Sequence, residues 1–400
     1  MAIRNARKRD SQQWLLDYLV KETGIEQNFE VGLRRYPRSV KSYRMIGKIV
    51  GEQAEHAERI AREAETRGYL NSAEELYSRA MELYRVGQHA IFEDDHPVKI
   101  KLYAGLQRCF DRIMELSSTT IERIEVPWQG REIQIVLHLL PGRPTAPVVL
   151  YVPGMDETKE ASLSPRRYFL QRGVHYTAMD GPGQGISNLR KIRVTDDNYE
   201  SAGKAVIDYL AARPEIDAER IGVMGRSMGS FWAPRIAALD PRVKALAAGS
   251  ACFAPKVYIF NQSSPRFKQV FMYMAGMADD EDAFDEMVDR MVLTGYAGKI
   301  GCPTLLVTGE FDPLSPVEFA KEVFDELSGP KEIWVRENNF HKSDNDGDMG
   351  GGQIEMFMAD WIVERLKNGC DPSLNRAQYV RVGGRGPFDS PIPEDYPWRW

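Results

Sequence analysis

A serine between two glycines is the first feature of this sequence that could carry covalent chemistry. Residues 225–229 read Gly-Arg-Ser-Met-Gly; they follow the apolar run 221–224 and precede a helical pattern that begins at Phe231. A strand, a G-x-S-x-G turn and a helix are typical of a nucleophile elbow, in which the glycines permit a tight turn that exposes the serine hydroxyl. Ser227 is therefore the candidate nucleophile, and an ordinary loop serine is the alternative.

A serine hydroxyl needs a general base, and that base needs a carboxylate to orient it. Of the six histidines, only His341 follows the last predicted strand, in a loop before a helix predicted from about 354 to 366. Asp312 lies just after the apolar run 304–307 and is the candidate acid, with Glu310 as its rival. The chain order serine, aspartate, histidine is that of the α/β-hydrolases.

The negative charge that develops on an attacked carbonyl oxygen needs fixed hydrogen-bond donors. The backbone N–H of Met228 is one candidate for this oxyanion hole, and the N–H of Met155, in the loop after the strand 148–152, is the second. Residues 180–185, Asp-Gly-Pro-Gly-Gln-Gly, contain three glycines, but their spacing and their place after a later strand do not fit a dinucleotide site. We interpret them as a strand-to-loop turn near the site.

The elements that must position these residues follow from the hydrophobic pattern. From residue 119 onward a hairpin turning at Gln129-Gly130 is followed by short apolar runs that alternate with helical stretches. Strands buried on both faces and separated by helices predict a doubly wound, mostly parallel sheet of α/β class. The predicted buried strands are 148–152, 174–179, 221–224, 245–248, 304–307 and 333–335.

Three further regions complete the predicted organisation. Residues 1–118 are helical by their three- and four-residue apolar spacing, and form a bundle that supports the rest or also walls a substrate pocket. Residues 119–370 form the hydrolase core, with a cap inserted at about 252–300 whose Met and aromatic stripe suits either core or pocket lining. Its acidic run 279–289 suits a solvated helix face, and 371–400 is predicted to be an extended tail.

Composition and charge exclude several classes of protein. The chain has 400 residues, 43% of them hydrophobic and 28% charged, which is typical of a globular protein. A net charge of -6 disfavours nucleic acid as a partner, and no stretch has the length and apolarity of a membrane helix. Four widely spaced cysteines offer no metal or redox pair, so we expect reduced thiols, no metal and a cytoplasmic protein.

Several segments together resemble a known family. Residues 154–160, 180–185, 225–229 and 309–312, with the Phe340-His341 pair, are similar to the α/β-hydrolases typified by 2,6-dihydroxypseudooxynicotine hydrolase. The same segments are also similar to the fungal pigment hydrolases that shorten polyketide chains and to a group of esterases. It covers nearly the whole chain, because that family also has a helical N-terminal domain before the hydrolase core.

The resemblance implies a serine hydrolase that needs no cofactor, acts on a small carbonyl substrate and forms a homodimer, with the N-terminal helices closing the pocket. The implied reaction is hydrolytic C–C cleavage of an activated ketone or β-dicarbonyl, aromatic or polyketide-like. A carboxylesterase or lactone hydrolase for small esters is the alternative. A non-catalytic binding protein built on the same core is a more remote one.

The sequence departs from the family at one point. C–C cleaving relatives use an extra carboxylate early in the cap, whereas residues 251–278 contain no Asp or Glu. Tyr258 and Lys256 are the titratable side chains near the expected place, apart from Cys252. Tyr258, Trp232 and Phe253 are the candidate residues of the substrate pocket, and Tyr258 is a candidate proton donor.

Overall fold

The chain folds into two compact units in the computed structural model, which describes residues 27–28, 35–36, 39–341, 346–350, 353–388, 391–394 and 396. The helical unit consists of Met1–Glu122 together with Ser264–Tyr273. The sheet unit consists of Arg123–Ser263 and Met274–Trp400. The first boundary lies four residues beyond the predicted one, and one short segment of the predicted cap belongs to the helical unit.

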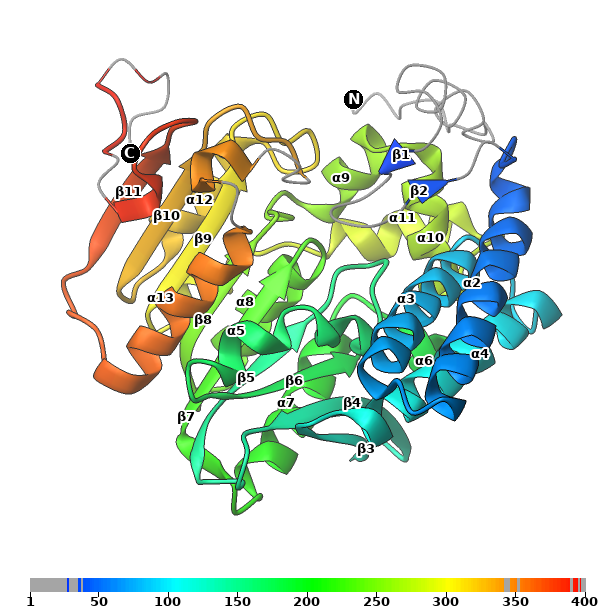
Figure 1. Cartoon of the computed structure of the whole chain (residues 1–400). Helices are drawn as coiled ribbons and strands as arrows, with labels where there is room; N and C mark the ends of the chain where they lie inside the picture. Colours follow the sequence, from blue (N-terminus) through cyan, green and yellow to red (C-terminus); the bar gives the residue numbers. More distant parts are fainter. Residues whose placement is uncertain are drawn as a thin grey trace. The chain divides into compact units, whose positions relative to one another are not determined.

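The described part of the helical unit includes the long helices α2 (Tyr43–Thr66), α3 (Leu70–His89) and α4 (Pro97–Leu116) (Figure 1). Small buried side chains recur along α2 at Ala54, Ala57, Ala61 and Ala64, so a single face of this helix packs inward. Pro97 opens α4, and the ring of the preceding His96 accepts a hydrogen bond from the N–H of Val98. These helices confirm the predicted periodicity after residue 42, while the segment predicted around residues 14–19 lies outside the described residues.

The segment Ser264–Tyr273 contributes most of helix α10 (Pro265–Ala275) to the helical unit. The guanidinium of Arg266 stacks over the rings of Tyr43 and Phe92, at 4.9 Å and 5.0 Å from their centroids. The ammonium of Lys99 lies 5.1 Å from the ring centroid of Tyr273. The Met and aromatic stripe of the predicted cap is therefore largely buried, and its first part is core of the helical unit.

The sheet unit is built on nine strands in the order β11-β10-β9-β8-β7-β5-β6-β4-β3. Neighbours from β5 to β11 run parallel, and β4 pairs antiparallel with β6. This arrangement confirms the predicted doubly wound, mostly parallel sheet. The strands are β3 (Thr120–Trp128), β4 (Arg131–Leu139), β5 (Ala146–Val152), β6 (His175–Asp180), β7 (Ile216–Arg226), β8 (Val243–Gly249), β9 (Thr304–Gly309), β10 (Lys331–Arg336) and β11 (Asn375–Val380).

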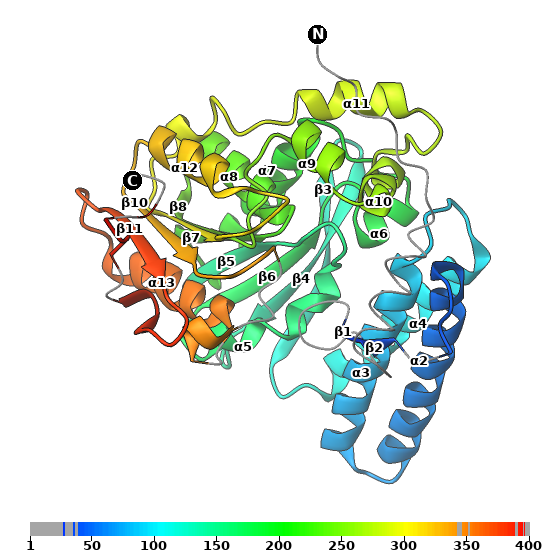
Figure 2. The same cartoon turned by 90° about the horizontal axis from the view of Figure 1, so that it is seen from above.

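Helices cover both faces of this sheet (Figure 2). On one side lie α7 (Asn198–Ala211), α8 (Gly229–Leu239) and α12 (Val317–Glu326), and on the other lie α5 (Arg166–Leu170) and α13 (Ile354–Asn368). The apolar core under α13 is continuous with the strands, since buried side chains of the helix such as Trp361 and Ile362 join those of β5 and β6. The central strands read as unbroken apolar runs because both of their faces are buried.

Two predicted segments take a more specific form than expected. The tail beyond residue 370 includes the strand β11, which pairs in parallel with β10 and extends the sheet by one strand. This part of the predicted tail therefore belongs to the sheet. The acidic run forms α11 (Glu281–Asp289), capped by the side chain of Asp280. Phe284, Met287 and Val288 are buried on α11 while most of its carboxylates face solvent, as predicted for a solvated helix face.

Candidate active site

Ser227 occupies a sharp turn between β7 and α8. Its φ is 53°, in the left-handed region that a non-glycine residue rarely adopts. The two flanking glycines make the turn possible: a Cβ on Gly225 would lie 2.1 Å from the Gly229 carbonyl oxygen, and one on Gly229 would lie 1.9 Å from that of Val152. The sequence therefore folds here as the nucleophile elbow that the G-x-S-x-G pattern predicts.

The structure brings Ser227, His341 and Asp312 into one hydrogen-bonded chain. The Oγ of Ser227 lies 2.9 Å from the Nε2 of His341, and the Nδ1 of His341 lies 2.9 Å from the Oδ2 of Asp312. His341 comes from the loop after β10, and Asp312 from the loop after β9. This arrangement permits the histidine to accept the serine proton on one nitrogen while the carboxylate holds the other.

The geometry separates Asp312 from its rival Glu310. Asp312 is buried, and its Oδ1 accepts hydrogen bonds from the backbone N–H groups of Leu314, at 2.9 Å, and Ser315, at 3.3 Å. The Oε2 of Glu310 instead accepts the hydroxyl of Tyr379 at 2.9 Å and the N–H of Asn338 at 3.0 Å. The carboxylate hydrogen-bonded to His341 is thus that of Asp312.

The two residues predicted to supply oxyanion donors lie in segments that adjoin Ser227. Met228 directly follows Ser227, and α8 begins at the next residue. The loop after β5 touches the elbow, since a Cβ on Gly154 would lie 3.1 Å from the Cβ of Ser227. Met155 follows Gly154 and is buried.

The three predicted pocket residues have different neighbours. Trp232 is buried in α8 and stacks on Tyr199, with ring centroids 4.0 Å apart. Phe253 is buried after β8, and its N–H donates to the hydroxyl of Ser315 at 2.9 Å. The ring of Tyr258, on α9 (Lys256–Gln262), is half-buried and lies 5.1 Å from that of Phe319.

Two buried groups beside the triad carry no motif in the sequence. Cys252 is buried, and burial raises the pKa of its thiol to about 12, so it is a neutral thiol at physiological pH. Lys256 is fully buried and donates from Nζ to the carbonyl oxygens of Cys252 and Ala254, both at 2.6 Å. Burial lowers the pKa of the Lys256 ammonium to about 7. In the sequence, the feature that pointed to Lys256 was its position at the start of the predicted cap.

The loop that follows β5 is tied to the residue before the nucleophile. The carboxylate of Glu157 accepts the N–H of Gly154 at 3.2 Å and the hydroxyl of Tyr151 at 2.7 Å. Its other oxygen lies 3.5 Å from a guanidinium nitrogen of Arg226. Arg226 therefore links the Ser227 elbow to the loop that carries Met155.

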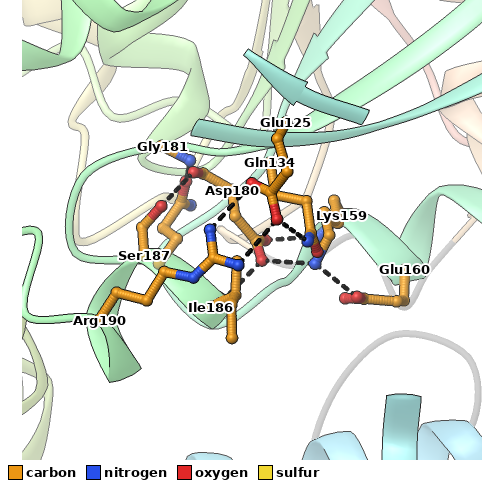
Figure 3. Close-up of polar contacts among 10 residues, drawn as sticks. Glu125, Gln134, Lys159, Glu160, Asp180, Gly181, Ile186, Ser187 and Arg190 are labelled. Carbon is orange, nitrogen blue, oxygen red and sulfur yellow. Dashed lines mark hydrogen bonds and ion pairs between the residues drawn. The ribbon is translucent and has the colours of Figure 1, made fainter. Parts of the chain in front are cut away.

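Asp180, the last residue of β6, joins the same loop to the turn at 180–185 (Figure 3). Its carboxylate accepts the backbone N–H of Lys159 at 2.7 Å, the ammonium of Lys159 at 2.9 Å and the N–H of Ile186 at 2.9 Å. The Lys159 ammonium also donates to Glu160 at 2.6 Å, and all three charged side chains are fully buried. Burial raises the pKa of Asp180, while the Lys159 charge opposes that rise.

Neither a metal cluster nor a membrane span is found in the described residues. No group of three His, Cys, Asp or Glu side chains within them is placed to hold a metal ion. No helix in the described part of the chain is both long enough and apolar enough to cross a bilayer.

The fold is that of the α/β-hydrolases. The sequence model of the FrsA-like esterase family matches residues 38–347, and the chain belongs to this family. The protein is thus a hydrolase, as predicted.

Two relatives share most of their length with this chain. A 2,6-dihydropseudooxynicotine hydrolase of Paenarthrobacter nicotinovorans is 26% identical over 347 residues, which cover 86% of this chain and 90% of that protein. The 20-hydroxy-prefusarin hydrolase FUS2 of Gibberella moniliformis is 27% identical over 345 residues, which cover 71% of this chain and 79% of that protein. The resemblance to this group of hydrolases is thereby confirmed.

The same likeness appears among solved structures. The crystal structure of a 2,6-dihydroxy-pseudo-oxynicotine hydrolase matches with a TM-score of 0.74, covering 92% of this chain and 99% of that one at 24% identity. The structure of AbyA5 matches with a TM-score of 0.62, covering 80% of this chain and 89% of that one at 18% identity. At these identities the matches establish the shared fold alone.

Proposed function

We propose that this protein is a serine hydrolase in which Ser227, His341 and Asp312 act on a carbonyl substrate. The observation that carries the proposal is the continuous pair of 2.9 Å hydrogen bonds from Ser227 through His341 to Asp312. The strained φ of 53° at Ser227 adds support, because strain held by the surrounding structure is typical of functional turns. No cofactor is needed for this chemistry.

The reaction proceeds in two halves. His341 accepts the proton of Ser227 as the serine oxygen bonds to the substrate carbonyl carbon, and the resulting oxyanion is held by the N–H groups of Met228 and Met155. For an ester, His341 then delivers that proton to the departing alkoxide. For a ketone, Tyr258 protonates the carbon of the departing enolate, and the proton on His341 passes to the tyrosinate, so that His341 is again a base. Water, deprotonated by His341, attacks the acyl-serine, and a carboxylate leaves.

The favoured substrate is an activated ketone or β-dicarbonyl of aromatic or polyketide-like character. Hydrolysis of R–CO–CH₂–CO–R′ breaks the bond between the attacked carbonyl carbon and the CH₂ group, which departs as an enolate and takes up one proton to become a methyl ketone. The other product is R–COOH, with one oxygen from water. The names of the two relatives, hydrolases of a pseudooxynicotine and of a prefusarin, support substrates of this kind.

Protonation of the enolate at carbon needs a donor in the place where C–C cleaving relatives have a carboxylate. Residues 251–278 contain no Asp or Glu, and Tyr258 on α9 carries a phenol in that stretch. Tyr258 is therefore the proposed donor. Trp232 and Phe253 are proposed to shape the acyl side of the pocket.

Ester hydrolysis is the second candidate function, and the description of the matched family as esterases favours it. The same triad expels an alkoxide, which His341 can protonate directly. A carboxylesterase or lactone hydrolase would need no second donor.

The homodimer, the cytoplasmic location and the absence of nucleic-acid partners stay predictions. The helical unit is the proposed pocket lid and dimerisation element. Size-exclusion chromatography with light scattering tests the dimer.

One experiment decides among these functions. Purified protein and its Ser227→Ala variant are incubated in H₂¹⁸O with an aryl β-diketone and with p-nitrophenyl acetate, and the products are identified by mass. We expect an ¹⁸O-labelled carboxylate and a methyl ketone from the diketone, with no product from the variant. Ester turnover without ketone cleavage would make the protein a carboxylesterase. Failure of both substrates, and of a fluorophosphonate to label Ser227, would favour a binding protein.

A further inference from the structure

The peptide group between Gly154 and Met155 is held by hydrogen bonds to its carbonyl oxygen. The Gly154 oxygen accepts the side-chain Nε2 of Gln184 at 2.7 Å and the backbone N–H of Glu157 at 3.2 Å. A trans peptide is planar, so its C=O and N–H point in opposite directions. Whatever fixes the Gly154 oxygen therefore also aims the N–H of Met155.

Gln184 is itself fully engaged. Its Nε2 also donates to the Pro153 carbonyl at 3.2 Å, so two carbonyl oxygens face the amide nitrogen and determine which way the amide group points. Its Oε1 accepts the hydroxyl of Tyr199 at 2.6 Å and the N–H of Gly181 at 3.3 Å. The side chain is buried, and all of its hydrogen-bonding capacity serves protein groups.

The backbone around Gln184 is anchored at both ends. The carboxylate of Asp180 holds Ile186 on one side and Lys159 on the other (Figure 3). Gly181 lets the turn approach Tyr199 closely, since a Cβ there would lie 2.3 Å from the tyrosine ring. The ring of Tyr199 in turn stacks on Trp232 of α8, at 4.0 Å between centroids and 2° between planes. The turn therefore connects the loop of Met155 to the helix that follows Ser227.

We infer that Gln184 is a positioning residue of the oxyanion hole, which aims and polarises the Met155 N–H by holding the Gly154 carbonyl. This inference rests on the proposed function, in which Met155 donates to the oxyanion. A hydrogen bond to the oxygen of a peptide draws electrons from its nitrogen and strengthens the N–H as a donor. Oxyanion donors act over a narrow range of distance, so a small tilt of this peptide reduces the rate.

The main test replaces Gln184 by methionine, which has a similar length and volume but no donor. With p-nitrophenyl acetate as substrate, we expect Gln184→Met to lower kcat by about tenfold to a hundredfold and to change KM little. The inhibition constant of an aryl trifluoromethyl ketone, which forms a tetrahedral adduct with the serine, should rise by a similar factor. A purely structural role predicts no such parallel change in well-folded protein.

Gln184→Met removes the acceptor of the buried Tyr199 hydroxyl. Two further variants test the inference in case this loss prevents Gln184→Met from folding. Tyr199→Phe keeps the ring that stacks on Trp232 and removes only the hydroxyl that orients Gln184. We expect a smaller loss, about threefold to tenfold in kcat, again matched by the trifluoromethyl ketone. The double variant with Gln184→Met removes both partners and should resemble Gln184→Met.

Ser187→Ala is the matched control. Ser187 is buried in the same turn, and its hydroxyl donates to the Asp180 carbonyl at 2.7 Å. We expect this variant to keep kcat and the inhibition constant within about twofold of wild type, because the Ser187 hydroxyl donates to Asp180 and not to the Gly154 carbonyl that Gln184 holds. An equal loss in Ser187→Ala would overturn the inference in favour of a general loosening of the turn.

Ser227→Ala separates this inference from the function on which it rests. If Ser227→Ala keeps its esterase activity, the proposed function fails and the inference fails with it. If Ser227→Ala is inactive while Gln184→Met and Tyr199→Phe keep wild-type kcat and inhibitor affinity, only the positioning role is overturned.

Discussion

The Nε2 of His341 lies 2.9 Å from the Oγ of Ser227, although 114 positions separate the two residues in the chain. Ser227 follows β7 and His341 follows β10, and two further strands, β8 and β9, lie between them in the sheet. Parallel strands end at the same edge, so the loops that follow them converge there. The loop after β10 reaches across this edge to place an imidazole beside the serine.

Removal of the nucleophile or the base should abolish turnover. We expect Ser227→Ala and His341→Ala each to lose about 10⁴-fold or more in kcat, because triad members act as a unit. Thermal unfolding should change little, since neither side chain contributes to the apolar core. Steady-state kinetics and circular dichroism on the same preparations check both statements, and a variant that retains a tenth of the activity would contradict the assigned role.

The acid is tested by a pair of variants in one loop. Asp312→Asn should lower kcat strongly, though somewhat less than loss of the base, because the amide cannot stabilise the imidazolium. Glu310→Gln, which alters a carboxylate bonded to Tyr379 and Asn338, should stay near wild type. The opposite ranking in kcat would assign the acid to Glu310.

Tyr258→Phe should separate the two candidate reactions. If the phenol protonates the enolate, the variant slows β-diketone cleavage by about tenfold to a thousandfold and slows ester cleavage far less. Product formation from both substrates is followed by liquid chromatography with the same enzyme stock. Equal slowing of both reactions would mean that Tyr258 shapes the pocket and donates no proton. An activated diketone should also be a better substrate than a simple aryl ketone.

Lys256 should make stability depend on pH. Burial lowers its pKa to about 7 in the folded protein, whereas an unfolded lysine titrates near 10.4. Between these two pKa values the unfolded chain binds one more proton than the folded protein, so the free energy of unfolding rises with pH, by at most about 1.4 kcal/mol per pH unit. This gain in stability is lost as the pH falls toward 7.

Lys256→Met lacks this group. The stability of wild type relative to Lys256→Met should therefore be about 2 kcal/mol greater at pH 9.5 than at pH 7.5, measured by chemical denaturation. Lys204→Met, a change of an exposed lysine paired with Asp208, should show no such difference. A pH-independent gap between wild type and Lys256→Met would show that Lys256 does not titrate in this range.

Deletion of residues 1–118 should leave a protein that is poorly soluble or inactive. Within the helical unit, Arg266 stacks on Tyr43 and Phe92 and Lys99 lies over Tyr273, so the deletion strips the segment Ser264–Tyr273 of its partners. Buried aromatic and methionine side chains of this segment would then meet water. Soluble yield and esterase rate of the truncated and full-length proteins are compared. A soluble core with full activity on a large substrate would argue against a role for the helices at the pocket.

The hydrophobic pattern of the sequence was enough to predict the buried strands and the loops in which the candidate site residues lie. Apolar runs such as 148–152 and 221–224 lie within β5 and β7, because a strand buried on both faces needs an uninterrupted apolar run. The hydrogen-bonded set Ser227, Asp312 and His341 could be proposed from the sequence because each residue lies within a few positions of the end of such a strand. The G-x-S-x-G turn carries its own geometric requirement in its glycines.

Tertiary structure alone decided the parts whose stabilising contacts come from distant segments. The polar segment Asn375–Val380 forms β11 because β10 supplies its hydrogen bonds on one side, a pairing that needs no apolar run. Helix α10 joins the helical unit through Tyr43 and Phe92, more than a hundred residues away. Gln184 carries no local pattern because the carbonyl oxygens that it binds, those of Pro153 and Gly154, come from another loop. Lys256 binds carbonyl oxygens of its own segment, and its lowered pKa comes from burial. Such contacts exist only once the chain has folded.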